Sequence, residues 1–182
     1  MGAIALMPLP GAEAIDLERI ALQLEFSLHR DVTLAESLRH VDQAYDPSRD
    51  QYNSRTLIDL LRGLVPRDAE RVLGVTSVDL FIPVLTFVFG EAQLGGPAGV
   101  VSFFRLDNRF YGLPENGELL LARLVKECVH EIGHTYGLLH CPDPDCVMRS
   151  STYVEQIDLK PANFCIECAR SVQPDGPSSR MR

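Results

Sequence analysis

The chain carries the segment His130-Glu131-Ile132-Gly133-His134-Thr135-Tyr136-Gly137-Leu138-Leu139-His140, which reads H-E-x-x-H-x-x-G-x-x-H. On an α-helix, residues four apart point almost the same way, so His130 and His134 can place two imidazoles on one metal ion. Gly137 tolerates the left-handed conformation that ends a helix. The turn there is expected to bring His140 back as a third ligand.

The ligand set indicates what kind of metal site this is. Three histidines leave the fourth position of a tetrahedral zinc ion open for water, as in catalytic rather than structural sites. Glu131 lies one residue round the helix from His130, where it can take a proton from that water and later pass it to the leaving amine. The bare H-E-x-x-H pattern would arise by chance in roughly one such chain in a hundred, and Gly137 with His140 lowers those odds about five-hundredfold. A catalytic zinc site is therefore favoured over a helix with solvated or core histidines.

A second set of metal-ligand residues follows directly. Cys141 and Cys146 precede a C-x-x-C pair, Cys165 and Cys168. Two nearby cysteine pairs fit a tetrahedral structural zinc site with all four positions filled by protein. Disulfides and a redox pair are the alternatives, but a cytoplasmic protein disfavours the first and the absence of a thioredoxin-like position disfavours the second. We predict two zinc ions per chain, and we interpret Cys128 as a small core residue.

Composition limits the partners and the location. A chain of 182 residues fits one domain with a sizeable core. A formal charge of −8 and a pI near 5.1 argue against nucleic acid or an anionic membrane as a partner. The apolar segment 1–10 is short and has no basic residue, so it is not expected to be a signal peptide, and no run is long enough to span a bilayer. We expect a cytoplasmic monomer.

Apolar and polar residues alternate with the periods of strands and helices along the chain. Strands are predicted at residues 4–8, 32–38, 71–76, 78–82, 85–89 and 99–106. Helices are predicted at residues 17–28, 55–64 with Ser54 as N-cap, and 116–136. Residues 45–54 are polar and rich in turn-forming side chains, which predicts a surface loop. Strands alternating with helices favour an α/β fold with a largely parallel sheet packed against helices.

The predicted organisation is a single domain at residues 1–171. Its C-terminal part, residues 141–168, contains the four-cysteine zinc-binding segment. Residues 172–182 are expected to be a disordered tail, because this end of the chain is rich in proline, glycine and serine.

The motifs together resemble a known family. The segment from His130 to His140, continued by Cys141-x4-Cys146-x-Met148 and later by Cys165-x-x-Cys168, is similar to the archaemetzincin family of the metzincin zinc metalloproteases. Weaker similarity extends to residues 46–54 and 74–81. The resemblance implies a mixed sheet packed on two helices, with the active-site helix at the base of a cleft. It also implies that Met148 lies beneath the zinc ligands and that the substrate is a peptide or protein.

Three further features are open at this point. Glu127 shares a helix face with His134, so it could hydrogen-bond a ligand or be a solvated carboxylate of the cleft. Tyr153 could lend a hydroxyl to an oxyanion, although a packing role is favoured. In metzincins an edge strand borders the cleft, and residues 85–89 are the candidate for the strand along which an extended peptide would bind.

Two other classes of function compete with the peptidase. The chain could be a catalytically weak or inactive zinc-containing module that binds peptides or proteins, but an intact Glu131 argues against this because a binding module needs no base. Alternatively, the cysteine-rich part could be a separate zinc-ribbon interaction module. The absence of any linker between His140 and Cys141 argues against that.

Overall fold

A five-stranded sheet forms the centre of the molecule in the computed structural model, which describes residues 2–172. The strand order is β2 (Val32–Leu34), β1 (Ala3–Pro8), β5 (Ala69–Thr76), β8 (Ala98–Ser102) and β7 (Gly90–Ala92). The first four strands are parallel to one another, and only β7 runs antiparallel to its neighbour. The predicted mixed, largely parallel sheet is therefore confirmed.

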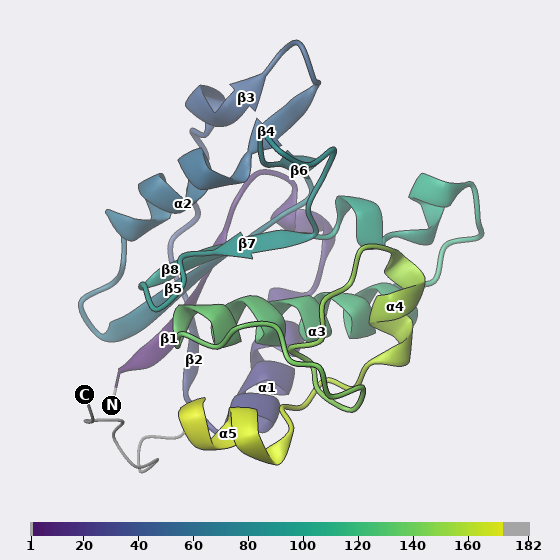
Figure 1. Cartoon of the computed structure of the whole chain (residues 1–182). Coiled ribbons are helices and arrows are strands. Elements are labelled where there is room, and N and C mark those ends of the chain that lie inside the picture. Colours follow the sequence, from purple (N-terminus) through teal and green to yellow (C-terminus); the bar gives the residue numbers. More distant parts are fainter. Residues whose placement is uncertain (1, 173–182) are drawn as a thin grey trace.

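Helices cover both faces of this sheet. Successive side chains of β1 point to opposite faces, so Ile4 and Leu6 pack in one cluster while Ala5 and Met7 pack in another. The first cluster lies against α1 (Leu17–Leu28) and α3 (Gly117–Thr135), and the second lies against α2 (Ser54–Arg62). Figure 1 shows α2 on the side of the sheet away from α1 and α3.

Side chains that cap the helices fix where they begin. The carboxylate of Asp16 accepts the backbone N–H of Arg19 at 3.0 Å, and Asn116 accepts that of Leu119 at 3.0 Å, so both helices begin as predicted. The N-cap of α2 is Asn53 rather than Ser54, because the Asn53 side chain accepts two N–H groups of the first turn.

The polar segment 45–54 is more ordered than a surface loop. β3 (Tyr45–Asp46) and β4 (Gln51–Asn53) pair as a short hairpin, and β4 adds in parallel to β6 (Leu80–Phe81). This small sheet stands above the main one in Figure 1. Elsewhere in residues 2–172 the chain forms four short 3₁₀ turns, at Ala12–Ala14, Asp42–Ala44, Phe104–Leu106 and Asn108–Tyr111.

The predicted strand at residues 85–89 is wrong. Apart from one bridge between Val88 and Leu80, this segment forms no strand. Side chains of Arg49 and Gln51 donate hydrogen bonds to the carbonyls of Leu85 and Thr86, which a strand would present to a neighbouring strand. The edge strand next to this segment is β7, which begins directly after it.

Two other predicted strands end early. β2 stops at Leu34 instead of residue 38, and β8 stops at Ser102, where a 3₁₀ turn replaces the predicted continuation to residue 106.

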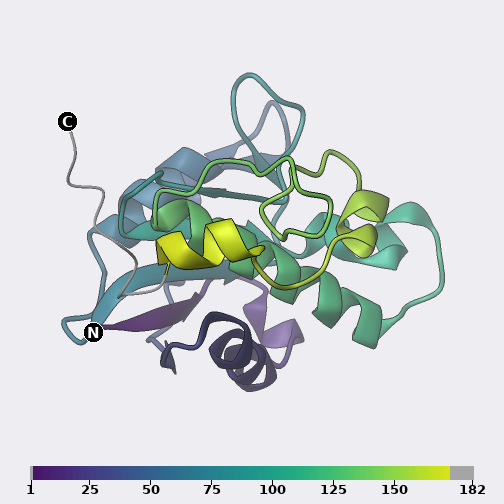
Figure 2. The same ribbon diagram turned by 60° about the horizontal axis from the view of Figure 1, so that its bottom comes forward.

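Two short helices follow α3. α4 (Val154–Leu159) packs against α3, and α5 (Ile166–Val172) lies near α1 in both Figure 1 and Figure 2. The predicted start of the tail at residue 172 is wrong, because Val172 is the last residue of α5 and is 5% exposed. Its carbonyl accepts a hydrogen bond from Arg30. The rest of the predicted tail, residues 173–182, lies outside the described residues. Among the helices of residues 2–172, none has both the length and the apolarity to cross a membrane.

Two leucines of α1 test the core. We expect Leu24→Ala to lower the free energy of unfolding by roughly 2–5 kcal/mol, because Leu24 is fully buried between α1 and the sheet. Leu22→Ala on the same helix is the control, since Leu22 is 66% exposed and its loss should change stability by less than about 0.5 kcal/mol. Urea unfolding of both variants measures the difference. Equal destabilisation would contradict this packing of α1.

Candidate metal centres and active-site cleft

Backbone carbonyl groups orient the two histidines of α3. The Nδ1 atom of His130 lies 2.8 Å from the carbonyl oxygen of Val147, and the Nδ1 atom of His134 lies 2.7 Å from that of Leu138. A carbonyl oxygen can only accept, so each Nδ1 carries the proton and donates it. Each Nε2 atom therefore keeps a free lone pair.

The two Nε2 atoms face each other at 3.1 Å. With both protons on Nδ1, two lone pairs meet at this distance, and a cation between them would turn that repulsion into attraction. Zinc–nitrogen bonds of about 2.0–2.1 Å in a tetrahedron place the nitrogens roughly 3.3 Å apart. The ring of His140 lies 5.0 Å and 5.3 Å from the other two rings, and the donor atoms of all three residues lie within 4.8 Å of one another. The three predicted ligands are thus together and fit zinc.

The protonation of the triad also suits a metal. Burial lowers the pKa of His130 well below its usual value, and the nearby Lys160 ammonium lowers it further. Burial likewise lowers the pKa of His134 and of His140. All three imidazoles are therefore neutral near pH 7, which is the form that binds metal.

The turn after α3 brings His140 to the other two histidines. The helix ends at Thr135, and Gly137 has φ +91°, the left-handed conformation predicted for it. The N–H of Gly137 donates to the carbonyl of His134 at 2.9 Å, and the N–H of Leu138 donates to that of Gly133 at 3.1 Å. This reversal also delivers the Leu138 carbonyl that orients His134.

Glu131 lies in the wall of the cleft beside the triad. It is 4% exposed, and its Oε2 atom has no hydrogen-bond partner among residues 2–172. Burial raises its pKa well above the usual range, and the carboxylate of Glu127 raises it further. Gly90 of β7 packs against this side chain so closely that a Cβ there would lie 2.8 Å from the Glu131 Cγ atom. Within the described chain, the Oε2 atom is thus a buried, unpaired oxygen in the wall of the cleft.

Glu127 forms a buried ion pair that sequence reasoning missed. Its Oε1 atom lies 2.9 Å from the Nζ atom of Lys160, and the two side chains are 5% and 1% exposed. Lys160 also donates to the carbonyl of Arg149 at 3.3 Å. The solvated-carboxylate interpretation of Glu127 is therefore wrong. No sequence signal identified Lys160, because a single lysine after a short helix usually lies in solvent.

A cleft of about 630 Å³ lies over the histidine triad. Its lining includes residues 85–92 and residues 150–153. Tyr153 is 67% exposed and lines this cleft, so the favoured packing role is wrong. The complete lining is Ile82, Leu85, Thr86, Phe87, Val88, Phe89, Gly90, Glu91, Ala92, Leu94, Glu127, His130, Glu131, His134, Leu139, His140, Ser150, Ser151, Thr152 and Tyr153.

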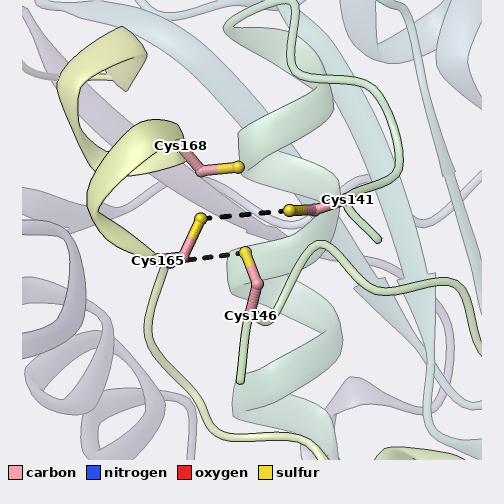
Figure 3. Close-up of side chains that lie close together, drawn as sticks. All are labelled: Cys141, Cys146, Cys165 and Cys168. Atoms are coloured by element: carbon pink, nitrogen blue, oxygen red, sulfur yellow. Dashed lines mark hydrogen bonds between the residues drawn. The ribbon is translucent and has the colours of Figure 1, made fainter. Parts of the chain in front are cut away.

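The four predicted cysteine ligands also come together. Figure 3 shows the sulfur atoms of Cys141, Cys146, Cys165 and Cys168 turned toward one another. Their ligand atoms lie within 4.8 Å of one another, and the Sγ atoms of Cys141 and Cys165 are 3.9 Å apart. A disulfide needs about 2.05 Å, whereas a tetrahedral zinc ion with bonds of about 2.3 Å places sulfurs roughly 3.8 Å apart. The geometry fits zinc, while Cys128 is fully buried in the core as predicted.

The two clusters are joined through the backbone. Cys141 directly follows His140, and its N–H donates to the carbonyl of Met148 at 3.0 Å. Val147, whose carbonyl orients His130, directly follows Cys146. The cysteine cluster thus holds the segment that positions two of the three histidines.

Comparison with known proteins identifies relatives along most of the chain. The model of peptidase family M54 matches residues 31–174. The archaemetzincin of Methanopyrus kandleri is 47% identical over 132 residues, which cover 72% of this chain and 71% of that protein. The archaemetzincin of Methanocaldococcus jannaschii is 44% identical over 133 residues, covering 73% and 72%.

Solved structures extend this similarity to the fold. The crystal structure of the Methanopyrus kandleri archaemetzincin superposes with a TM-score of 0.79 at 38% identity and covers 94% of each chain. That of the Archaeoglobus fulgidus archaemetzincin, complexed with malonate, gives 0.78 at 37% identity and covers 93% of this chain and 99% of the other. The fold and these relatives place the protein among the zinc metallopeptidases. Within that class, the chain belongs to the archaemetzincins of peptidase family M54.

Gly133 makes a testable contact beneath the triad. A Cβ there would overlap the Met148 sulfur and would lie 3.0 Å from the Phe164 ring. Glycine to alanine inside a helix normally stabilises by about 1 kcal/mol, but here the clash should outweigh that gain. We expect Gly133→Ala to lower the melting temperature by several degrees.

Gly117→Ala is the matched control on the same helix, because a Cβ at Gly117 meets no atom within 4 Å. Its melting temperature should stay level or rise. Calorimetry of both variants decides the point, and a Gly133→Ala protein as stable as the parent would show that Met148 does not press on α3.

Proposed function

We propose that the protein hydrolyses peptide bonds as a metzincin-type enzyme, with zinc held by His130, His134 and His140. The observation that carries this is the pair of Nε2 lone pairs facing each other at 3.1 Å in the floor of the cleft. Zinc bound there would act as a Lewis acid that makes water acidic near neutral pH and polarises a carbonyl group.

In this proposal Glu131 is the general base and then the general acid. Its buried carboxylate has an oxygen free of protein hydrogen bonds, next to the triad. It takes a proton from the attacking water and passes it to the amine that leaves. The raised pKa of Glu131 stabilises the protonated carboxyl that forms when it takes the proton. A cation bound at the triad would lower that pKa again and favour the ionised carboxylate that acts as the base.

The substrate would bind as an extended strand along β7. This strand ends the order of the main sheet, pairs on one side with β8, and contributes Gly90, Glu91 and Ala92 to the cleft. An added strand satisfies the substrate backbone without reading its sequence. Side chains of residues 85–89 then supply an apolar wall, which favours apolar side chains next to the cleaved bond.

We also propose that Cys141, Cys146, Cys165 and Cys168 hold a second, structural zinc ion. All four positions of a tetrahedron would then be filled by thiolates, so that metal supplies order rather than chemistry. Two ligand sets that share no residue support two zinc ions per chain.

Glu131→Gln tests the assignment of the base. We expect hydrolysis to fall by at least about a hundredfold while zinc content stays that of the parent, because the residue acts on protons and not on the metal. Glu118→Gln on the exposed start of α3 is the control and should keep full activity. Digestion of a broad peptide library together with elemental analysis measures both. Loss of zinc together with activity would contradict the role given to Glu131.

Zinc counting tests the two sites. Elemental analysis of protein purified without chelators should find two zinc ions per chain in the parent and one in His134→Ala. Cys165→Ser should lose one zinc and also several degrees of melting temperature, because thiolate binding is coupled to folding. Cys128→Ala removes a cysteine outside both clusters and should retain both ions. One zinc in the parent would overturn the two-site proposal.

A further inference from the structure

The wall of the cleft at residues 82–89 is held by side chains from elsewhere in the chain. This segment lacks regular structure apart from one bridge at Val88, yet most of its residues line the cleft. The guanidinium of Arg49 donates to the carbonyl of Leu85 at 2.9 Å, and the amide of Gln51 donates to that of Thr86 at 3.0 Å. A segment without ladder hydrogen bonds depends on such bonds for its shape.

Asp79 is the centre of this network. Its carboxylate accepts the Gln51 amide at 2.8 Å and two N–H groups of Arg105 at 2.6 and 2.7 Å. The side chains of Asp79 and Arg105 are only 11% and 22% exposed, so this bidentate pair is shielded from water. The Asp79 carboxylate therefore fixes both the Gln51 amide, which holds Thr86, and the Arg105 guanidinium.

Arg105 carries the network to an aromatic ring of the wall. Its guanidinium lies 4.3 Å from the ring centre of Phe87 and 4.6 Å from that of Phe110. The charge of Arg105 is balanced by Asp79, so its planar faces are free to stack on both rings. Phe87 is thus held against a support that lies outside the cleft.

We propose that Asp79, acting through Gln51 and Arg105, is a positioning residue that sets the shape of the substrate-binding wall. It does not line the cleft, and neither do Gln51 or Arg105. The metal ligands and Glu131 lie on α3 and the turn after it, so loss of the network should leave the chemical groups in place. The wall would move, and the apolar side chains of a peptide would bind less well. This inference rests on the proposed peptidase function.

The chain offers a matched control for Asp79. Asp107 also accepts two N–H groups of one arginine, Arg109, and its side chain is 12% exposed. Neither Asp107 nor Arg109 lines the cleft. Asp79→Asn and Asp107→Asn therefore each remove one negative charge from a bidentate pair, although Arg109 is 59% exposed and Arg105 22%. Of the two, only Asp79 hydrogen-bonds side chains that contact residues 82–89.

The first experiment needs no activity. Hydrogen exchange of the zinc-loaded full chain, followed by mass spectrometry, should show faster exchange at residues 82–89 in Asp79→Asn and parent-like exchange there in Asp107→Asn. Arg49→Met supplies a second variant in case Asp79→Asn folds poorly. It removes the guanidinium, and with it both the bond to the Leu85 carbonyl and the contact with the Phe81 ring, so exchange of the same segment should rise.

The second experiment separates binding from chemistry. For an apolar peptide that the parent cleaves, Asp79→Asn should raise KM about tenfold and leave kcat within roughly twofold, the pattern of a lost binding contribution. Acetohydroxamate, which reaches the metal but not the wall, should inhibit both proteins equally. Calorimetric titration of the peptide into Glu131→Gln with and without Asp79→Asn should show the same tenfold loss.

The outcomes separate failure of the role proposed for Asp79 from failure of the proposed peptidase function. Unchanged KM and unchanged exchange at residues 82–89 in Asp79→Asn, with a parent that cleaves normally, would overturn the role of Asp79 alone. Equal effects of Asp107→Asn would also overturn it, since the loss would then follow from stability. A parent that neither cleaves nor binds peptides would overturn the peptidase proposal, and the substrate role of Asp79 with it.

Discussion

Two hydrogen bonds from imidazole to backbone carbonyl govern the geometry of the histidine triad. Val147 and Leu138 accept the Nδ1 protons of His130 and His134, and both carbonyls lie in the segment that follows α3. A helix alone places two rings on one face but leaves their rotation and tautomer open. The carbonyls settle both, because each Nε2 must then present its lone pair inward. The site is therefore a product of the helix and of the loop that returns beneath it.

That loop has little regular structure of its own to hold it. Between the end of α3 and the start of α4 the described chain has no helix or strand, so it lacks the regular backbone hydrogen bonds that hold such elements. The cysteine cluster compensates for this, because its members bracket Val147 and are tied through the Cys141 N–H to the Met148 carbonyl. In the proposed two-zinc enzyme, the metal at the cysteines therefore helps to orient His130, and the two sites are coupled by position as well as by sequence.

Sequence reasoning located the groups that act through local geometry. The spacing of His130 and His134, the left-handed Gly137 and the Asn116 boundary of α3 each follow from a few neighbouring residues, and all are present. The misplaced features depend on partners far along the chain. The alternating residues 85–89 have the pattern of a strand, but side chains of Arg49 and Gln51 occupy two of their carbonyls. The pairing of Glu127 with Lys160 joins α3 to the residue directly after α4 and has no local signature either.

The Glu127–Lys160 pair is better explained by its effect on the position of the backbone near Arg149 than by its contribution to stability. Burying two charges costs several kcal/mol per ion before their attraction is counted, and well-packed apolar residues often replace such pairs without loss. Here the ammonium also donates to the Arg149 carbonyl, next to Met148, so it connects one turn of α3 with the backbone directly beneath the triad. Two apolar side chains could fill the same space, but they form no hydrogen bond and so could not fix which backbone carbonyl lies beside them. The hydrogen bond from Lys160 to the Arg149 carbonyl is directional, and it holds the backbone two residues after Val147, whose carbonyl orients His130.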